Sequence, residues 1–154
     1  MSEPLRLPHL RSSLLQPIVC LTSVTHEQRE TLATADAFRI LTSIWQLSSE
    51  FDGWYVGDYL LMPDHVHLFA RAGFEAKPLA QWIETWKSLS ARRLKPLLGI
   101  ETSFWQQDSF DRFLRSADNY SMEWDYVNMN PVRRGLCGRP EDWPWKGRLC
   151  DLKY

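Results

Sequence analysis

The run from Leu60 to Phe69 constrains the fold more than any other part of this sequence. It reads LLMPDHVHLF, and its second half alternates His65 and His67 with apolar residues, which is the pattern of a half-buried β-strand. Alternate residues of a strand project from one face, so the two imidazoles should lie together, with backbones roughly 6–7 Å apart. One metal ion can bridge two histidines at that separation. The pair therefore predicts a sheet that carries a metal site, although two solvent-facing histidines are the plainer alternative.

Periodicity and turn signals predict four strands and three helices. The strands are expected at residues 17–24, 54–62, 65–71 and 103–114, and the helices at residues 35–51, 78–94 and 118–130. Pro63 and Asp64 should form the turn between the second and third strands, Pro96 should close the second helix, and Asp118 could cap the third. Residues 1–16 are expected to form an irregular lead-in, and residues 132–154 an irregular tail. The order β-α-β-β-α-β-α predicts an α+β fold in one domain, residues 17–154: a ferredoxin-like βαββαβ antiparallel sheet with an added C-terminal helix.

The charge distribution permits a nucleic-acid partner without requiring one. The net charge is −1, but residues 1–75 hold five Lys and Arg against nine Asp and Glu, whereas residues 76–154 hold thirteen against ten. A local basic patch could bind phosphates if the acidic half faces away. The candidate backbone contacts are basic residues of the second helix and of the segments flanking the third: Lys87, Arg92, Arg93, Arg112, Arg115, Arg133 and Arg134. Each of them could equally belong to an ordinary solvated surface.

Cysteine usage and hydropathy set the expected compartment. Cys20, Cys137 and Cys150 show no CxxC spacing, which argues against a disulfide framework or a zinc ribbon. No stretch approaches the roughly eighteen apolar residues of a membrane span, and the N-terminus lacks the apolar core of a signal peptide. We therefore expect reduced thiols in a cytoplasmic protein without a membrane partner.

The third predicted helix separates two tyrosines. At about 100° per residue, Tyr120, Trp124 and Val127 form an apolar stripe that should face the core. Tyr126 and Asn130 share a polar flank, one turn apart. A tyrosine hydroxyl, with an ordinary pKa near 10, becomes a nucleophile when a divalent metal polarises the target phosphate. The amide oxygen of Asn130 could be a third ligand beside the histidines. Alternatively, Asn130 could simply end the helix.

Two runs of the sequence resemble a known family. MPDHVHL at residues 62–68 and YVNMNPVRRGL at residues 126–136 are similar to the single-tyrosine HUH transposases, most of all the REP-associated tyrosine transposases. The segments FWQ (104–106), FDR (110–112) and RPEDWPW (139–145) also resemble that family. A lone HxH is a weak signal, but HxH on a strand followed about sixty residues later by YxxxNPVRxGL is specific. The similarity spans roughly residues 17–145.

The resemblance implies a role for each matching residue. His65 and His67 would hold Mg²⁺ or Mn²⁺ with Asn130 as the third ligand, and Tyr126 would attack a phosphodiester of single-stranded DNA. The products would be a 5′-phosphotyrosine link and a free 3′-OH. The implied partner is DNA with palindromic repeats, folded as hairpins, bound by a monomer or a homodimer. Two alternatives stay open: a ferredoxin-like module that binds structured nucleic acid without cutting it, and a hydrolase that uses the metal with water and leaves Tyr126 without a role.

Overall fold

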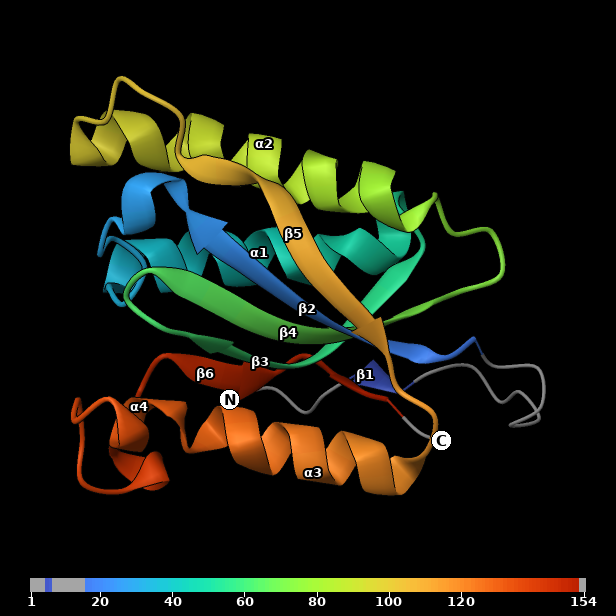
Figure 1. Ribbon diagram of the computed structural model, residues 1–154. Helices are drawn as coiled ribbons and strands as arrows, with labels where there is room; N and C mark the ends of the chain where they lie inside the picture. Colours follow the sequence, from blue (N-terminus) through green and yellow to red (C-terminus); the bar gives the residue numbers. More distant parts are fainter. Residues whose placement is uncertain (1–4, 7–15, 153–154) are drawn as a thin grey trace.

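A five-stranded antiparallel sheet forms the centre of the computed structural model, which describes residues 5–6 and 16–152 (Figure 1). The strand order is β5-β2-β4-β3-β6. These strands are β2 (Ile18–Thr25), β3 (Trp54–Leu61), β4 (His65–Ala72), β5 (Trp105–Phe113) and β6 (Lys146–Arg148). Helices α1 (Ala35–Phe51) and α2 (Leu79–Leu98) cover one face, and α3 (Ala117–Asn128) covers the other. The predicted α+β ferredoxin-like fold with an added C-terminal helix is confirmed.

The face under α1 and α2 holds the larger apolar core. Leu68 of β4 is fully buried there, and Trp45 of α1 and Trp86 of α2 are each 1% exposed. Trp54 of β3 stacks on Trp82 of α2, with ring centroids 5.0 Å apart. Bulky apolar side chains thus fill the space between this face and both helices, which is the main source of folding free energy in a domain of this size.

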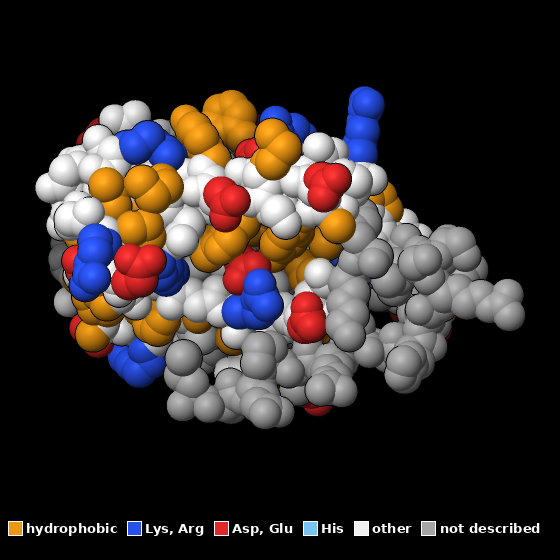
Figure 2. All heavy atoms as spheres, turned by 90° about the horizontal axis from the view of Figure 1, so that it is seen from below, with side chains coloured by type: hydrophobic (Ala, Val, Ile, Leu, Met, Phe, Trp, Pro, Cys, Tyr) orange, Lys and Arg blue, Asp and Glu red, His pale blue; other side chains and the backbone are white. Residues whose placement is uncertain are grey.

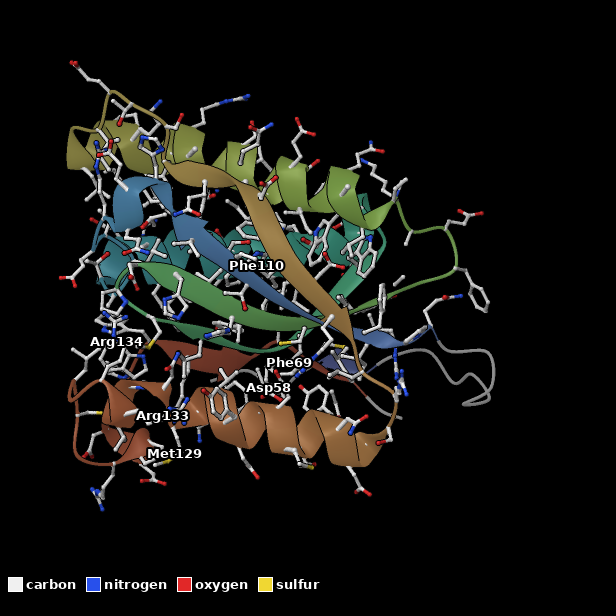
Figure 3. The ribbon with its side chains drawn as sticks, in the orientation of Figure 1. Asp58, Phe69, Phe110, Met129, Arg133 and Arg134 are labelled. Atoms are coloured by element: carbon white, nitrogen blue, oxygen red, sulfur yellow. The ribbon has the colours of Figure 1, made fainter. Side chains whose placement is uncertain are left out.

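The opposite face has a smaller cluster and depends more on polar contacts. The predicted stripe of Tyr120, Trp124 and Val127 packs on this face, as expected from the helix arithmetic. The Tyr120 hydroxyl donates to Asp58 Oδ2 at 2.5 Å. Phe69 and Asp58 lie between the sheet and α3 (Figure 3), so α3 is held by an aromatic contact and by a buried carboxylate.

Three predicted helix boundaries are wrong. Helix α2 runs through Pro96 to Leu98. Pro96 lies in the last turn, where it removes one helical hydrogen bond, and the end is instead set by Gly99, whose φ of 66° forms the left-handed cap. Helix α3 is capped by Ser116 in place of Asp118, because the Ser116 hydroxyl accepts from the backbone of Asn119. Its predicted extension to residue 130 is interrupted, and a short helix α4 (Asn130–Arg133) follows.

The C-terminal tail is ordered into strands, which corrects the prediction of an irregular segment. β6 adds a fifth strand beside β3, and β7 (Cys150–Asp151) pairs in parallel with β1 (Leu5–Arg6). Trp143 fixes the start of this tail by donating from Nε1 to the Leu61 carbonyl at 2.9 Å. Strands of two or three residues are too short to show an alternating pattern, so no sequence signal predicts them. The predicted irregular lead-in lies mostly outside the described residues, apart from β1.

Two features bear on the predictions from composition. No helix in the described ranges is long and apolar enough to cross a membrane. All three cysteines are present as thiols. Burial raises the pKa of Cys20 to about 12 and that of Cys150 to about 11, so both stay protonated and unreactive at neutral pH.

Candidate active site

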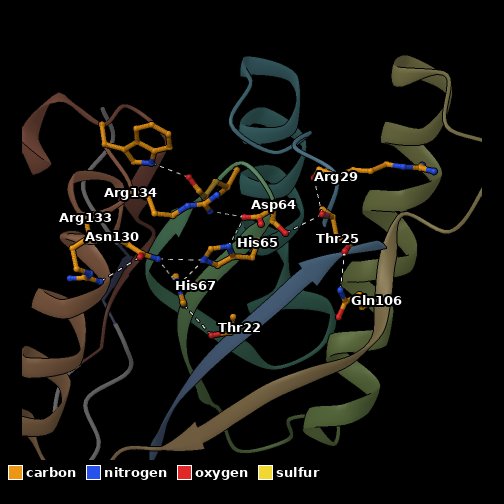
Figure 4. A network of polar contacts seen from close by, with 12 residues as sticks. Thr22, Thr25, Arg29, Asp64, His65, His67, Gln106, Asn130, Arg133 and Arg134 are labelled. Carbon is orange, nitrogen blue, oxygen red and sulfur yellow. Dashed lines mark hydrogen bonds and ion pairs between the residues drawn. The ribbon is translucent and has the colours of Figure 1, made fainter. Parts of the chain in front are cut away.

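β4 directs both histidines to the face covered by α3. His65 and His67 alternate with Val66 and Leu68, which are buried in the core on the other face. The two imidazole Nε2 atoms lie 3.2 Å apart, and the rings are edge to face with centroids 4.8 Å apart (Figure 4). The predicted convergence of the two side chains is therefore observed.

A polar contact behind each ring fixes the orientation of the pair. His65 Nδ1 lies 2.8 Å from Asp64 Oδ1, and because a carboxylate only accepts, Nδ1 carries the proton and Nε2 presents a lone pair. His67 Nδ1 lies 3.0 Å from the Thr22 hydroxyl, directly across the β2–β4 ladder. Arg134 donates to the same Asp64 oxygen at 3.0 Å. Partial burial opposes ionisation of Asp64, but the hydrogen bonds from His65 and Arg134 outweigh it and lower the pKa of this carboxyl.

The sequence prediction missed both supporting residues. Asp64 was assigned to a turn, although its position directly before the HxH pair could have signalled a carboxylate behind a histidine ligand. Thr22 carried no signal, because its role comes from strand pairing over 45 residues of sequence separation.

His67 is held in its neutral form. Burial is the main cause that lowers its pKa to about 3, followed by the repulsion that a protonated His65 would exert and by the charge of Arg133. The ring is therefore neutral at physiological pH. In the tautomer whose Nδ1 donates to the Thr22 hydroxyl, the Nε2 lone pair faces His65 and is available to a metal ion.

Asn130 completes the cluster from a separate element. As the first residue of α4, it brings its amide nitrogen to 3.4 Å from His65 Nε2 and 3.2 Å from His67 Nε2. The strand and the helical segment thus meet within one chain, which the sequence could not establish. The Asn130 amide can donate one N–H to each imidazole Nε2. Both Nε2 lone pairs therefore point toward one position, and a cation at that position would also be stabilised.

These donors fit a divalent metal ion. Two neutral imidazole nitrogens can ligate it directly, and a half-turn of the Asn130 amide would offer an oxygen as the third ligand. Within the described part of the chain, no group of three or more His, Cys, Asp or Glu side chains could hold a metal. Beside the two histidines, the Asn130 amide oxygen would be the third protein ligand, with water in the remaining positions.

Tyr126 lies one turn before Asn130, near the end of α3. Its side chain is 66% exposed, consistent with its predicted position off the packed stripe. The Arg133 guanidinium covers its ring, with Cζ 3.9 Å from the ring centroid. Arg133 also donates to the Tyr126 carbonyl at 2.6 Å and lies 3.5 Å from Asn130 Oδ1. Arg133 therefore links the tyrosine to the cluster.

The seven predicted basic contacts are spread over several surfaces. Arg133 and Arg134 border the histidine pair (Figures 3 and 4). Arg112 of β5 forms an ion pair with Glu123 of α3, and Arg115 is exposed just before that helix. The remaining exposed arginines, Arg92 and Arg93, lie on α2, beyond the opposite face of the sheet. Viewed from below, the described part of the surface shows basic and acidic side chains interspersed among apolar ones, without a continuous basic area (Figure 2).

Lys87 does not occupy a position from which it could contact a DNA backbone. It is 8% exposed, and its ammonium donates to the carbonyls of Gln106 at 3.0 Å and Asp108 at 3.4 Å. The register between β2 and β5 shifts at this point, which leaves carbonyls outside the ladder. The Lys87 ammonium donates hydrogen bonds to these carbonyls, so the role of Lys87 is structural. This corrects the prediction that Lys87 contacts a phosphate.

Comparison with known proteins identifies the architecture. No family model and no curated protein matches the sequence. Among solved structures, a REP-associated tyrosine transposase bound to a REP hairpin superposes with a TM-score of 0.71 at 18% identity, covering 95% of this chain and 82% of that one. A candidate transposase from Deinococcus radiodurans R1 gives a TM-score of 0.56 at 17% identity, covering 79% of this chain and 95% of that one. The resemblance predicted from two motifs is thus confirmed for the architecture: the chain has the fold of a REP-associated tyrosine transposase.

Proposed function

We propose that the protein is a metal-dependent endonuclease and strand transferase that acts on single-stranded DNA beside hairpins of palindromic repeats. The convergence of His65, His67 and Asn130 carries this proposal, because it joins metal-ligand chemistry to the segment that follows Tyr126. The similarity in fold to a transposase bound to a REP hairpin supports the substrate class. The REP-associated tyrosine transposases are the family to which we assign the chain.

The proposed reaction is a transesterification at phosphorus. The Tyr126 phenolic oxygen attacks the phosphodiester, a bond forms between that oxygen and phosphorus, and the bond from phosphorus to the 3′-oxygen breaks. The phenolic proton is lost and the leaving 3′-oxygen gains one, which gives a 5′-phosphotyrosine and a 3′-OH. Reversal of these steps with a different 3′-OH transfers the strand, so no external energy source is needed.

The ligand set indicates which ions to test. A bound divalent ion would polarise the phosphodiester and stabilise the charge that develops on it. Mg²⁺ prefers an all-oxygen shell, whereas imidazole nitrogen suits transition metals better. Of the two expected ions, Mn²⁺ is therefore the better match to two histidines and one amide.

The surroundings of the site suggest how DNA is held. Arg133 and Arg134 are the proposed phosphate contacts beside the histidines, and Arg112 on β5 and Arg115 just after that strand are the proposed contacts further from them. Arg92 and Arg93 would contact DNA only if it passed round the edge of the sheet. A cytoplasmic location and a monomeric or homodimeric state stay predictions.

Covalent capture of DNA tests the proposal. A labelled hairpin oligonucleotide with single-stranded flanks is incubated with protein and Mn²⁺ or Mg²⁺, and the product is separated under denaturing conditions. Wild type should give a protein–DNA adduct that depends on the metal. Tyr126→Phe should give none while binding the hairpin equally well. Tyr55→Phe, a change on β3 away from the cluster, serves as the matched control and should retain the adduct.

Two alternatives predict different results. A non-cleaving binding module would bind the hairpin tightly without any adduct in either metal. A hydrolase using metal and water would cut the strand without becoming linked to it, and Tyr126→Phe would still cut. Either result would replace the proposed function.

A further inference from the structure

One row of directly paired residues crosses all five strands through His67. On one side of it, His67 pairs with Thr22 of β2, which pairs with Phe110 of β5. On the other side, His67 pairs with Leu60 of β3, which pairs with Lys146 of β6. Directly paired residues project from the same face of a sheet. Phe110 therefore lies on the face of the histidine pair, two strand spacings or roughly 10 Å from His67. Figure 3 marks the position of Phe110 on β5.

Phe110 is exposed at the open end of this row. Its side chain is 68% exposed, whereas Leu60 in the same row is fully buried. Thr22 stands between the ring and His67, and its hydroxyl lies 3.0 Å from the imidazole. Phe113, three residues along β5, is also exposed, at 51%, but it pairs with Val19 and so projects from the opposite face. The same strand thus presents one aromatic ring to the site and one away from it.

The charges around the site favour a strand that runs over this row. Helix α3 carries Asp118, Glu123 and Asp125 and contains no Lys or Arg, so its outer surface repels phosphates. Arg134 borders the histidines on the side of α4, and Arg112 projects from β5 on the same face as Phe110, where it is paired with Glu123. A backbone bound beside Arg134 and leaving the histidine pair would therefore pass over β2 and β5 more readily than along α3.

We infer that Phe110 is a stacking platform for one unpaired base of the nucleic acid whose phosphodiester lies at His65 and His67. The inference rests on the proposed function for its substrate class. An exposed aromatic ring offers its π-face to any base, so the contact positions the strand without reading its sequence. The base belongs to a nucleotide close to the scissile phosphodiester, on the β5 side of it.

Binding measurements on full-length protein test this position. Affinity for the hairpin with single-stranded flanks is measured by fluorescence anisotropy in a Tyr126→Phe background, so that no strand is cut. Phe110→Ala should weaken binding by about 5- to 100-fold, and Phe110→Trp should restore it. Phe113→Ala, the matched control on the same strand, should change affinity less than about twofold, since its ring faces away. Urea unfolding of each variant checks that the fold is retained.

An abasic scan separates stacking from a general structural effect. Each flanking nucleotide is replaced in turn by an abasic site, and affinity is compared with and without Phe110. At one or two positions the abasic site should weaken binding to the Phe110 protein but not to Phe110→Ala, which is the coupling expected of a direct contact.

Three outcomes would overturn the inference. Binding could be unchanged in Phe110→Ala, the scan could show no coupled position, or Phe110→Ala could convert a dimer to a monomer with unchanged DNA affinity, which would make this edge a contact between two copies of the chain. Failure of the proposed function is distinguishable, because it appears as a missing adduct with wild type while the coupling to Phe110 persists.

Discussion

The two faces of the sheet are built from alternate residues of the same strands, yet they differ in chemistry. On β4, Val66 and Leu68 enter an apolar core, while His65 and His67 enter a polar cluster. On β3, Tyr59 packs beside α1, and its neighbour Asp58 binds α3 from the other face. Because successive residues of a strand project from opposite faces, one strand can contribute side chains both to the apolar core and to the polar cluster.

This difference assigns separate tasks to the two faces. Apolar burial is non-directional and contributes free energy in proportion to area, so the α1–α2 face can tolerate small shifts of its side chains. Polar groups are costly to bury unless each has a partner, so the α3 face fixes directions: Asp64 orients His65, and Thr22 orients His67. We expect mutations on the first face to change stability and mutations on the second to change chemistry.

Substitution of two neighbours on β4 gives the largest predicted effects. His67→Ala should reduce metal-dependent adduct formation by at least about 100-fold, because one of two imidazole ligands is lost, while the unfolding free energy changes by less than about 1 kcal/mol. Leu68→Ala should lower the unfolding free energy by about 2–5 kcal/mol through the cavity it leaves, while the folded fraction still forms the adduct. Adduct yield and urea unfolding are measured for both. Equal losses of stability in the two variants would remove the distinction between the faces.

The pH dependence of stability provides a control on the first of these variants. The pKa of His67 is about 3 in the folded protein and near 6.5 in an unfolded chain, so between these values the unfolded state binds the extra proton. Wild type should therefore lose stability as pH falls below 6.5. His67→Ala lacks this contribution and should lose less between pH 6.5 and pH 4. Parallel pH profiles would contradict the neutral, half-buried state of His67.

Removing one hydroxyl from the polar face should have an intermediate effect. Thr22→Val keeps the shape of the side chain but leaves His67 Nδ1 without its partner, so the ring can rotate or adopt the other tautomer. Affinity for Mn²⁺, measured by isothermal titration calorimetry, should fall about 10- to 100-fold. Thr22→Ser retains the hydroxyl and should bind Mn²⁺ nearly as wild type does. If both variants bind equally well, Thr22 has no role in orienting the ligand.

The same comparison explains what could be predicted from the sequence. The observed bounds of α1 match the predicted residues 35–51, because apolar side chains recur at near-helical spacing along this segment and Asp52 and Gly53 follow its end. The HxH strand and the Tyr126–Asn130 spacing were found because they are local patterns. Local sequence patterns were therefore sufficient to predict the main helices and strands. They were also sufficient to select the four residues proposed for chemistry, which are His65, His67, Tyr126 and Asn130.

Contacts between distant segments could not be predicted in this way. Thr22 meets His67 through strand pairing, and Arg134 meets Asp64 across 70 residues of sequence. Lys87 looked like a surface cation, and its burial follows from a register shift in β5 that no local pattern encodes. The contacts that orient the site residues thus depend on how distant segments pack together, which local sequence patterns do not encode.

The smallest predicted effect concerns how α3 is attached. Tyr120→Phe removes a hydrogen bond to buried Asp58, which keeps two bonds from Arg148, so the unfolding free energy should fall by about 1–2 kcal/mol at pH 7. Tyr59→Phe on the other face removes a bond to the neutral Thr42 hydroxyl and should lower it by about 0.5–1 kcal/mol. Urea unfolding of the two variants compares a charged anchor with a neutral one.

Alkaline pH sharpens this last comparison. Burial, and then the Asp58 charge, raise the pKa of Tyr120 above its ordinary value of 10, so above pH 10 the unfolded chain releases a proton that the folded protein keeps. Stability from this group is therefore present below pH 10 and declines above it, by at most about 1.4 kcal/mol per pH unit. The deficit of Tyr120→Phe relative to wild type should then shrink between pH 10 and pH 11. A deficit that stays constant over that range would mean that the Tyr120 proton is not held by Asp58, and that α3 is attached by apolar packing as α1 is.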